Sequence, residues 1–137
     1  MTDILTPERR SWNMSRIRGK DTKPERIVRS LLHRLGYRFR LHRKDLPGRP
    51  DIVLPKYGTV IFVQGCFWHR HKGCEFAYTP KTRKDFWSRK FAGNVERDRK
   101  NQEKLRQLGW DVICVWECET RKDIEFVGKR LRKLLIE

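Results

Sequence analysis

Residues 50–63 read Pro50-Asp51-Ile52-Val53-Leu54-Pro55-Lys56-Tyr57-Gly58-Thr59-Val60-Ile61-Phe62-Val63, and this stretch decides the fold. Two short apolar runs rich in β-branched residues flank a turn that contains Pro and Gly, a pattern typical of two strands. The second run is apolar at nearly every position, as strands in the centre of a sheet are. The stretch therefore predicts two adjacent strands, the second of them central.

The elements on either side of this stretch alternate between helix and strand. A helix begins at Thr22, which can cap it, with Glu25 favourable near its positive end, and it ends at Gly36. Gly93 predicts a break between two later helices, with Asn94 as the second cap. The predicted elements in chain order are a helix from 22 to 36, strands over 37–41, 51–54 and 59–63, helices over 83–91 and 94–108, a strand over 110–116 and a helix over 123–135.

This order predicts an α/β fold with a central mixed β-sheet flanked by helices. Three consecutive strands favour hairpins, and a strand that follows a long helix can add in parallel. A chain of 137 residues fits one domain. We expect a single domain over residues 23–137, preceded by residues 1–22, which are either a disordered tail or an arm that orders on DNA.

The charge of the chain indicates a polyanionic partner. Lys and Arg number 33 against 17 Asp and Glu, a net charge of +16 that destabilises a compact fold by self-repulsion. The alternative is a merely basic protein, such as a ribosomal one. An anionic membrane surface is disfavoured, because the basic residues are spread along the chain and are not gathered on one amphipathic helix.

The apolar content of the N-terminus and the number of cysteines predict a cytoplasmic protein. No run reaches the roughly 20 apolar residues of a membrane span, and residues 1–7 lack the apolar core of a signal peptide. In the cytoplasm, four cysteines favour metal binding over disulfides.

A metal loop is predicted at Gly65-Cys66-Phe67-Trp68-His69-Arg70-His71-Lys72-Gly73-Cys74. Thiols and imidazoles at short spacing are ligands that zinc prefers. Cys114 shares the parity of apolar strand residues, so we expect it to pack in the strand, whereas Cys118 lies just beyond the strand end. The expected zinc ligands are Cys66, His71, Cys74 and Cys118, a closed set typical of structural zinc. The alternative ligand is His69 in place of His71.

A second, catalytic metal site is predicted at Asp51. Many nucleases place an Asp at the start of one strand and a second metal-binding group near the end of the next, where the two can share Mg²⁺. Here the second position offers only the Val63 carbonyl and the Gln64 amide. His69 is the expected general base, since its reference pKa suits proton transfer near neutrality; the alternative is a surface or zinc-binding histidine.

Two further acids and three aromatic residues complete the candidate site. Glu25 and Asp98 could serve the metal, although an acid on a charged helix is usually solvated. Phe67 and Trp68 are expected to be exposed beside the zinc loop, with Trp87 among basic residues. Side chains of this kind wedge between DNA bases, and the alternative for Trp87 is core packing.

These motifs together resemble the very-short-patch repair (Vsr) endonucleases of bacteria. The residues that carry the resemblance run in order over nearly the whole chain: Ser15-Arg16-Ile17-Arg18-Gly19-Lys20-Asp21-Thr22-Lys23-Pro24-Glu25, Gly48-Arg49-Pro50-Asp51-Ile52-Val53-Leu54, Gly65-Cys66-Phe67-Trp68-His69, Asn94-Val95-Glu96-Arg97-Asp98, Trp110-Asp111-Val112 and Val115-Trp116-Glu117-Cys118. The resemblance implies a restriction-endonuclease-like fold with a structural zinc. It also implies Mg²⁺-dependent nicking of duplex DNA on the 5′ side of the thymine in a T·G mismatch that arises from 5-methylcytosine deamination.

The resemblance also implies roles for individual residues. Asp51 binds Mg²⁺, His69 is the general base, and Glu25 and Asp98 support the hydrated metal. The residues that wedge into DNA are Phe67, Trp68 and Trp87, with Met14 of the arm approaching from the opposite groove. Family members often carry His where this chain has Gln64, whose amide can position a water molecule but cannot accept its proton. Gly73 lengthens the zinc loop by one residue relative to its tightest form.

The expected partner is double-stranded DNA with a T·G mismatch, and the resemblance adds a mismatch-repair adaptor and a repair polymerase. The protein is expected to be a nucleoid-associated bacterial protein, and a monomer suits an asymmetric lesion. Two other functions stay open: a restriction nuclease that cuts both strands of a paired site, and a zinc-stabilised DNA-binding module without catalysis.

Overall fold

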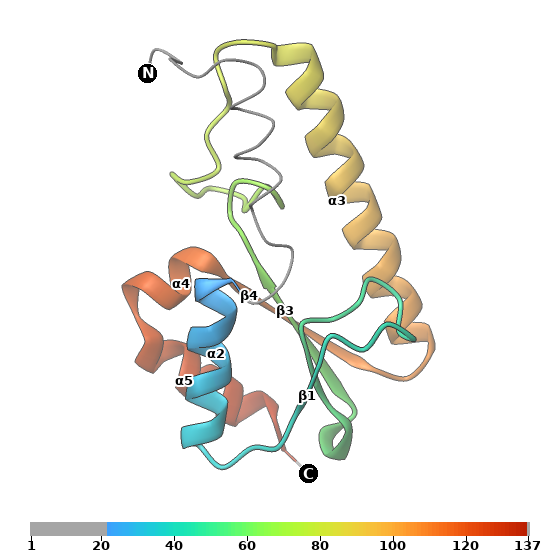
Figure 1. Cartoon of the computed structure of the whole chain (residues 1–137), viewed down its shortest axis with the longest axis vertical. Helices are drawn as coiled ribbons and strands as arrows, with labels where there is room; N and C mark the ends of the chain where they lie inside the picture. The colour runs from blue at the N-terminus through green and yellow to red at the C-terminus, as the bar shows by residue number, and fades with distance from the viewer. Residues whose placement is uncertain (1–21, 137) are drawn as a thin grey trace.

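A four-stranded mixed sheet in the order β1-β2-β3-β4 forms the centre of the computed structural model, which describes residues 22–136 (Figure 1). The strands are β1 (Arg40–Leu41), β2 (Ile52–Leu54), β3 (Thr59–Gln64) and β4 (Asp111–Trp116). The first three pair antiparallel, whereas β4 adds to β3 in parallel. The predicted hairpin, its central second strand and the parallel addition of the last strand are therefore confirmed.

The antiparallel hairpin places the beginning of β2 next to the end of β3, at the same end of the two strands. Ile52 pairs with Ile61, and the turn between the strands is a short 3₁₀ helix, η1 (Pro55–Tyr57). Gly58 follows in the left-handed conformation with φ of 59°, which glycine adopts without strain. The strand predicted over 37–41 was too long: only Arg40 and Leu41 pair, while Tyr37 and Phe39 pack against the core.

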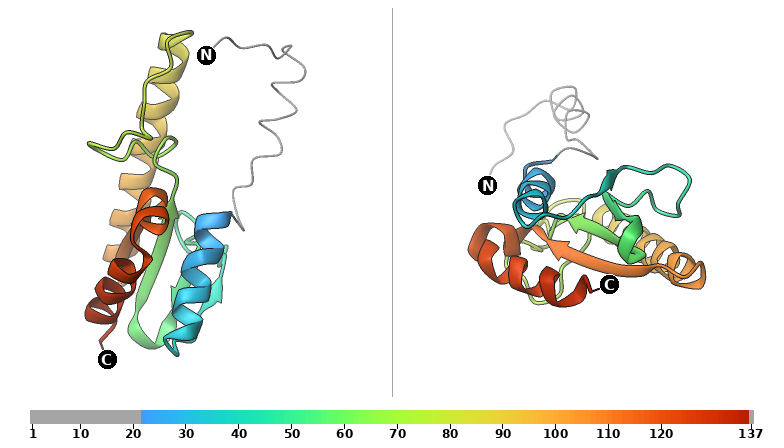
Figure 2. Two further views of the ribbon diagram at one scale, coloured as in Figure 1. Left: turned by 90° about the vertical axis from the view of Figure 1, so that its left-hand side faces the viewer. Right: turned by 90° about the horizontal axis from the view of Figure 1, so that it is seen from below.

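Helices cover both faces of the sheet (Figure 2). One face carries α2 (Lys23–Arg34), α4 (Glu117–Lys122) and α5 (Ile124–Leu134), and the other carries α3 (Lys84–Gln107). Side chains alternate between the faces, as strand geometry requires. The larger core, against α2 and α5, includes Leu32, Ile52, Ile61, Val115 and Leu131; the smaller core, against α3, includes Leu46, Val53, Val60 and Leu105.

Helix α3 is continuous, so the break predicted at Gly93 was wrong. It contains 24 residues, a length of about 36 Å, and its first half extends beyond the sheet together with the loop after β3 (Figure 1). Gly93 is exposed, and a Cβ there would meet nothing within 4 Å. A glycine inside a helix costs only about 1 kcal/mol; Phe91 and Asn94, buried on either side, offset that cost.

The remaining helices agree with the predicted pattern, with one addition. The Thr22 hydroxyl accepts the Glu25 N–H at 3.4 Å at the start of α2, and α5 occupies the predicted range. Helix α4 was not predicted; Glu119 closes its first turn by accepting the Trp116 N–H at 2.9 Å. Among residues 22–136, no helix is both long and apolar enough to cross a membrane. Met14 and almost all of the predicted arm lie outside the described residues.

Candidate active site and metal cluster

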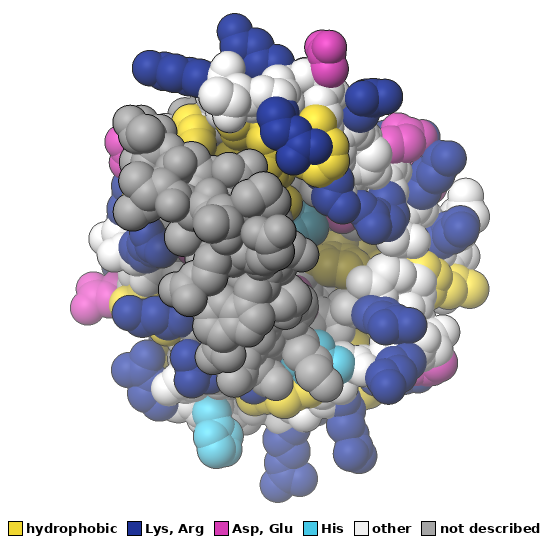
Figure 3. All heavy atoms as spheres, turned by 45° about the horizontal axis from the view of Figure 1, so that its top comes forward, with side chains coloured by type: hydrophobic (Ala, Val, Ile, Leu, Met, Phe, Trp, Pro, Cys, Tyr) yellow, Lys and Arg dark blue, Asp and Glu magenta, His cyan; other side chains and the backbone are white. Residues whose placement is uncertain are grey.

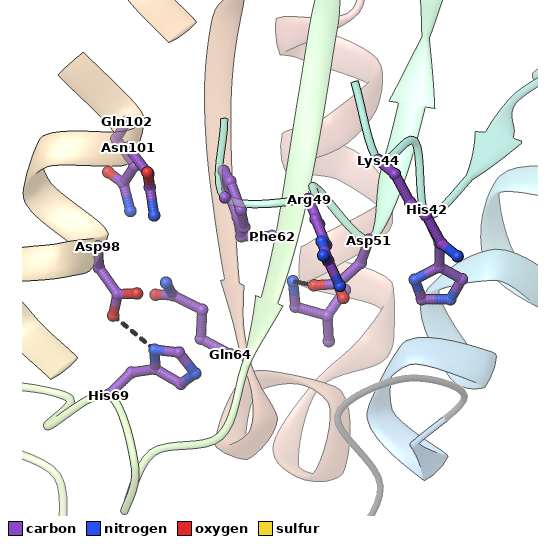
Figure 4. Close-up of a pocket in the computed structure, with 12 residues that line it drawn as sticks. His42, Lys44, Arg49, Asp51, Phe62, Gln64, His69, Asp98, Asn101 and Gln102 are labelled. Atoms are coloured by element: carbon purple, nitrogen blue, oxygen red, sulfur yellow. Dashed lines mark hydrogen bonds and ion pairs between the residues drawn. The ribbon is translucent and has the colours of Figure 1, made fainter. Parts of the chain in front are cut away.

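A cavity of about 510 Å³ opens where β2 begins and β3 ends, between the loop before β2 and helix α3 (Figure 4). Asp51, Gln64, His69 and Asp98, four of the predicted catalytic residues, line it. Asp51 directly precedes β2, Asp98 comes from α3, and His69 comes from the loop that leaves β3. The hairpin and α3 therefore bring together residues that are far apart in the sequence.

Asp51 is fixed by the neighbouring strand. Its Oδ2 accepts the backbone N–H of Val63 at 2.7 Å. Burial raises the pKa of Asp51 to about 7, the Val63 hydrogen bond opposes this rise, and the nearby charge of Glu25 adds to it. A divalent cation would reverse this balance, because it favours the ionised carboxylate.

Glu25 and His42 lie beside Asp51. Glu25 is 1% exposed, and its Oε1 lies 2.6 Å from Arg29 Nη2 and 2.8 Å from His42 Nε2. One ligand atom from each of Glu25, His42 and Asp51 falls within 4.8 Å of the others. Glu25 and Asp51 thus meet as the sequence suggested, and the group acquires an imidazole.

His69 and Asp98 form a pair on the opposite side of the cavity from His42 (Figure 4). His69 Nδ1 lies 2.5 Å from Asp98 Oδ2. Because a carboxylate can only accept, Nδ1 carries a proton in this contact, and in the neutral ring the lone pair is then on Nε2. This is the orientation in which an imidazole acts as a base. The structure therefore brings Asp98 into contact with His69, whereas Glu25 contacts Arg29 and His42.

Gln64 and Val63 end strand β3 at the rim of this cavity. Gln64 is 5% exposed, and its side chain points into the cavity on the side of His69 and Asp98 (Figure 4). Val63 contributes the N–H that Asp51 accepts. A contribution of the Val63 carbonyl to a metal site stays a prediction.

Helix α3 also anchors the loop that carries His69. The buried Asn94 donates from Nδ2 to the carbonyl oxygen of Trp68 at 3.1 Å, and Arg97 hydrogen-bonds to Asn94 Oδ1. A second cavity of about 630 Å³ lies beside the first, between α3 and Arg49. Asn94 was predicted only as a helix cap; its position one helical turn before Asp98 was the available signal for this second role.

Four predicted zinc ligands form a separate cluster. The ligand atoms of Cys66, His71, Cys74 and Cys118 lie within 4.8 Å of one another. His71 Nδ1 is 3.6 Å from Cys66 Sγ and 3.4 Å from Cys118 Sγ. In tetrahedral zinc sites, neighbouring N and S ligands are about 3.5 Å apart. The cluster therefore fits zinc.

The same geometry decides between the alternative zinc ligands, His69 or His71 and Cys114 or Cys118. His69 pairs with Asp98, so His71 is the imidazole of the cluster. Cys114 lies in β4, near Gln102 Nε2 at 3.4 Å, and takes no part. Burial raises the pKa of the Cys66 thiol to about 12, which a bound cation would lower by stabilising the thiolate. The His71 ring stacks on Trp116 with centroids 4.2 Å apart.

The predicted wedge residues gather in one aromatic cluster. The Phe67 ring contacts Trp68, Trp87 and Phe91 at centroid distances of 5.2, 5.6 and 5.1 Å. Phe67, Trp68 and Trp87 are half-buried, so Phe67 and Trp68 are less exposed than predicted, while Phe86 is 42% exposed. The cluster is anchored by Phe91, which is buried in α3.

The surface around the site is basic. In Figure 3, Lys and Arg predominate among the charged side chains, with apolar side chains between them. Arg49, Lys90 and Arg97 line the second cavity beside Trp68. Phosphate groups are the partners that such a surface attracts.

His42 is the functional candidate that sequence reasoning missed. Leu41 pairs with Ile52, and the next backbone N–H, that of His42, donates to the Asp51 carbonyl oxygen at 3.3 Å. The β1–β2 pairing thus sets His42 opposite Asp51. To predict from sequence that His42 lies beside Asp51, one would need the register between β2 and β1, and β1 has only two residues.

A solved structure shares the fold. The catalytic domain of the homing endonuclease I-Bth0305I aligns with a TM-score of 0.58 over 83% of this chain and 94% of that domain. Identity is 22%, so this match concerns the fold alone. It agrees with the endonuclease-like fold that the resemblance implied.

Curated relatives cover almost the whole chain. It is 53% identical to the Type II nicking enzyme V.XorIIP of Xanthomonas oryzae pv. oryzae, over 98% of both chains. Identity to the DNA mismatch endonuclease Vsr of Escherichia coli is 43%, over 100% of this chain and 87% of that protein. The family description "DNA mismatch endonuclease Vsr" matches residues 2–75. With its endonuclease fold and its two clusters of ligand-type residues, this chain belongs to the Vsr family of DNA endonucleases.

Proposed function

We propose that this protein nicks duplex DNA on the 5′ side of the thymine in a T·G mismatch, by Mg²⁺-dependent hydrolysis of one phosphodiester bond. The observation that carries the proposal is the Asp98–His69 pair that shares one cavity with the half-buried Asp51. A family described as mismatch endonucleases, together with relatives named nicking enzymes, supports both the lesion and the cutting of one strand.

His69 is the general base in this reaction. With Nδ1–H donated to Asp98, Nε2 can accept the proton of the water that attacks phosphorus. Asp98 stabilises the imidazolium that results and holds the ring in its orientation. Gln64 orients the attacking water, because its amide can hydrogen-bond to water but cannot take its proton.

Asp51 is the principal ligand of the catalytic Mg²⁺, with Glu25 and the Val63 carbonyl in support. When bound, the ion supplies positive charge that stabilises the phosphate in the transition state. Two nearby carboxylates and the raised pKa of Asp51 are features that a divalent cation offsets.

Zinc has a structural role in this proposal. Three thiolates and one imidazole fill a tetrahedral shell and leave no position for substrate. The metal joins Cys118, in helix α4, to the loop that carries Cys66 and Cys74. The zinc thus fixes His69 and Trp68, which lie between ligands on that loop.

Phe67, Trp68 and Trp87 enter the DNA beside the mismatch. Unstacking a base step costs a few kcal/mol and is least costly where pairing is poor. Met14 approaches from the other groove, and residues 1–22 form an arm on the DNA. The protein acts as a monomer in the bacterial cytoplasm, with an adaptor and a polymerase of mismatch repair as further partners.

The test is nicking of end-labelled duplexes that carry T·G, C·G or T·A at one position, with and without Mg²⁺. We expect one nick, only in the T·G duplex and only with Mg²⁺. Asp51→Ala and His69→Ala should each abolish it while zinc content and DNA binding remain. Cleavage of both strands of a paired site would favour a restriction nuclease, and binding without any cleavage would favour a DNA-binding module.

A further inference from the structure

Three side chains at the catalytic cavity converge as a mixed carboxylate and imidazole group. Glu25 comes from the first turn of α2, His42 from the residue after β1, and Asp51 from the residue before β2. Their ligand atoms lie within 4.8 Å of one another. Three separate elements therefore place ligand-type atoms close together, although the reaction proposed above uses only the two carboxylates among these side chains.

The backbone holds His42 in this position. Its N–H donates to the Asp51 carbonyl oxygen at 3.3 Å, directly after the Leu41–Ile52 pair of the β1–β2 ladder. Residues that face each other across a ladder carry side chains on the same face of the sheet. The strand register thus places the backbone of His42 opposite Asp51, and the contact of Nε2 with Glu25 at 2.8 Å places the imidazole in the same group.

The contacts of His42 Nε2 are those of a ligand atom. Arg29 Nη2 lies 3.1 Å away and can only donate, a contact that Nε2 meets with its lone pair when the ring proton is on Nδ1. Glu25 Oε1 lies 2.8 Å from the same nitrogen. Adjacent ligands of an octahedral cation with bonds of about 2.1 Å are about 3 Å apart. The pair therefore has the spacing of two neighbouring ligands.

We propose that His42 Nε2 is a direct ligand of the catalytic cation, together with Asp51 and Glu25. The inference rests on the proposed function, since it concerns the same cation. An imidazole in the site changes its selectivity. Mg²⁺ prefers oxygen ligands, whereas nitrogen ligands favour first-row transition ions such as Mn²⁺. The site accordingly binds Mn²⁺ more tightly than Mg²⁺.

The alternative role of His42 is to orient Glu25 through their contact. In that case the imidazole never touches the cation, and its replacement would weaken the binding of Mg²⁺ and Mn²⁺ equally. His42→Gln separates the two roles, because the glutamine amide can still hydrogen-bond to Glu25 and offers an oxygen in place of nitrogen. His33→Gln, an exposed histidine in the last turn of α2, is the matched control.

The experiment is pulsed electron paramagnetic resonance of Mn²⁺ bound to the full zinc-loaded chain, with calorimetric titration of Mn²⁺ and Mg²⁺. We expect nitrogen modulation from a coordinated imidazole in the parent, in His33→Gln and in His69→Gln, and its loss in His42→Gln. Mn²⁺ affinity should fall about tenfold or more in His42→Gln, with Mg²⁺ affinity nearly unchanged. Circular dichroism establishes that each variant is folded.

Three results would overturn the proposal: no imidazole modulation in the parent, modulation that persists in folded His42→Gln, or equal loss of affinity for both ions. The parent measurement needs no substitution, so a variant that fails to fold leaves the test intact. Nicking of T·G duplexes is assayed on the same samples. Nitrogen coordination without nicking would contradict the proposed function and support this site. Nicking without nitrogen coordination would support the proposed function and contradict this site.

Discussion

His69 Nδ1 and Asp98 Oδ2 lie 2.5 Å apart, although 29 positions separate the two residues in the sequence. The contact joins the loop after β3 to the middle of α3. It fixes which ring nitrogen of His69 faces the cavity, so the orientation of this imidazole depends on the position of the helix.

Asp98→Asn should lower the nicking rate roughly 10²- to 10⁴-fold, within the range that a misoriented general base loses. An amide at this position can donate to Nδ1 and so favours the wrong tautomer. Single-turnover nicking of a T·G duplex measures the effect. Glu96→Gln, on the exposed face of the same helix, should nick like the parent. Equal rates for Asp98→Asn and the parent would remove Asp98 from the mechanism.

Cys118→Ser should abolish stoichiometric zinc binding and lower the melting temperature by more than roughly 10 °C, because a structural zinc contributes directly to folding. Cys114→Ser should keep the zinc, since Cys114 lies outside the cluster. Zinc content by elemental analysis and melting by circular dichroism check both. Retention of zinc in Cys118→Ser would show that the fourth ligand is another group.

Asp51→Asn should stabilise the fold increasingly as pH rises, in zinc-loaded protein without added Mg²⁺. The pKa of Asp51 rises from 3.8 to about 7 on folding, chiefly through burial. Between these values the folded state holds a proton that the unfolded chain has released, so the free energy of unfolding falls as pH increases. The asparagine cannot ionise and avoids this loss.

Melting temperatures at about pH 5 and about pH 8 give the comparison for Asp51→Asn. The difference between variant and parent should be larger at the higher pH. Asp45→Asn serves as control: hydrogen bonding to Arg43 lowers the pKa of Asp45, so its ionisation is complete at both pH values. A difference for Asp51→Asn that does not depend on pH would contradict the raised pKa.

Gly93→Ala should stabilise the protein by about 0.5–1 kcal/mol, because alanine loses less backbone entropy in a helix than glycine. The added methyl group meets no atom within 4 Å. Gly58→Ala should destabilise, since Gly58 has a φ of 59°. Urea denaturation measures both, and destabilisation by Gly93→Ala would indicate that α3 is interrupted at this residue.

Trp68→Leu should lower nicking of T·G duplexes about 10- to 100-fold, since stacking of an aromatic ring on a base contributes about 1–3 kcal/mol. The fluorescence of 2-aminopurine beside the mismatch should rise less on binding than with the parent, because fewer bases are unstacked. Phe86→Leu, an exposed aromatic next to Trp87, should resemble the parent. An equal defect in both variants would refute the assignment of the wedge.

The sequence predicted the sheet and the zinc cluster well because both depend on local patterns. The apolar runs at 51–54 and 59–63 predict strands inside the sheet, where both faces are buried. Cys66, His71 and Cys74 are close in sequence before any folding occurs. Choosing Cys118 over Cys114 required only strand parity, which the structure confirms.

Predictions that depend on long-range packing were less successful. Gly93 is unfavourable in any helix, and only the burial of Phe91 and Asn94 explains why α3 continues through it. His42 was missed because β1 has just two residues, and its register with β2 leaves no signal in composition. The contact of Asp98 with His69 depends on where α3 crosses the sheet, which no local pattern encodes.

Because α3 is continuous, the spacing between Phe91 and Asp98 cannot change without rotating one relative to the other. Phe91 anchors the aromatic cluster and Asp98 orients His69, and the two are separated by about two helical turns. Inserting one residue between them would rotate one end by about 100° relative to the other. Side chains on the outer surface of this segment can vary, whereas a deletion or an insertion cannot be absorbed. The number of residues between Phe91 and Asp98 therefore matters more for this geometry than the identity of the exposed residues between them.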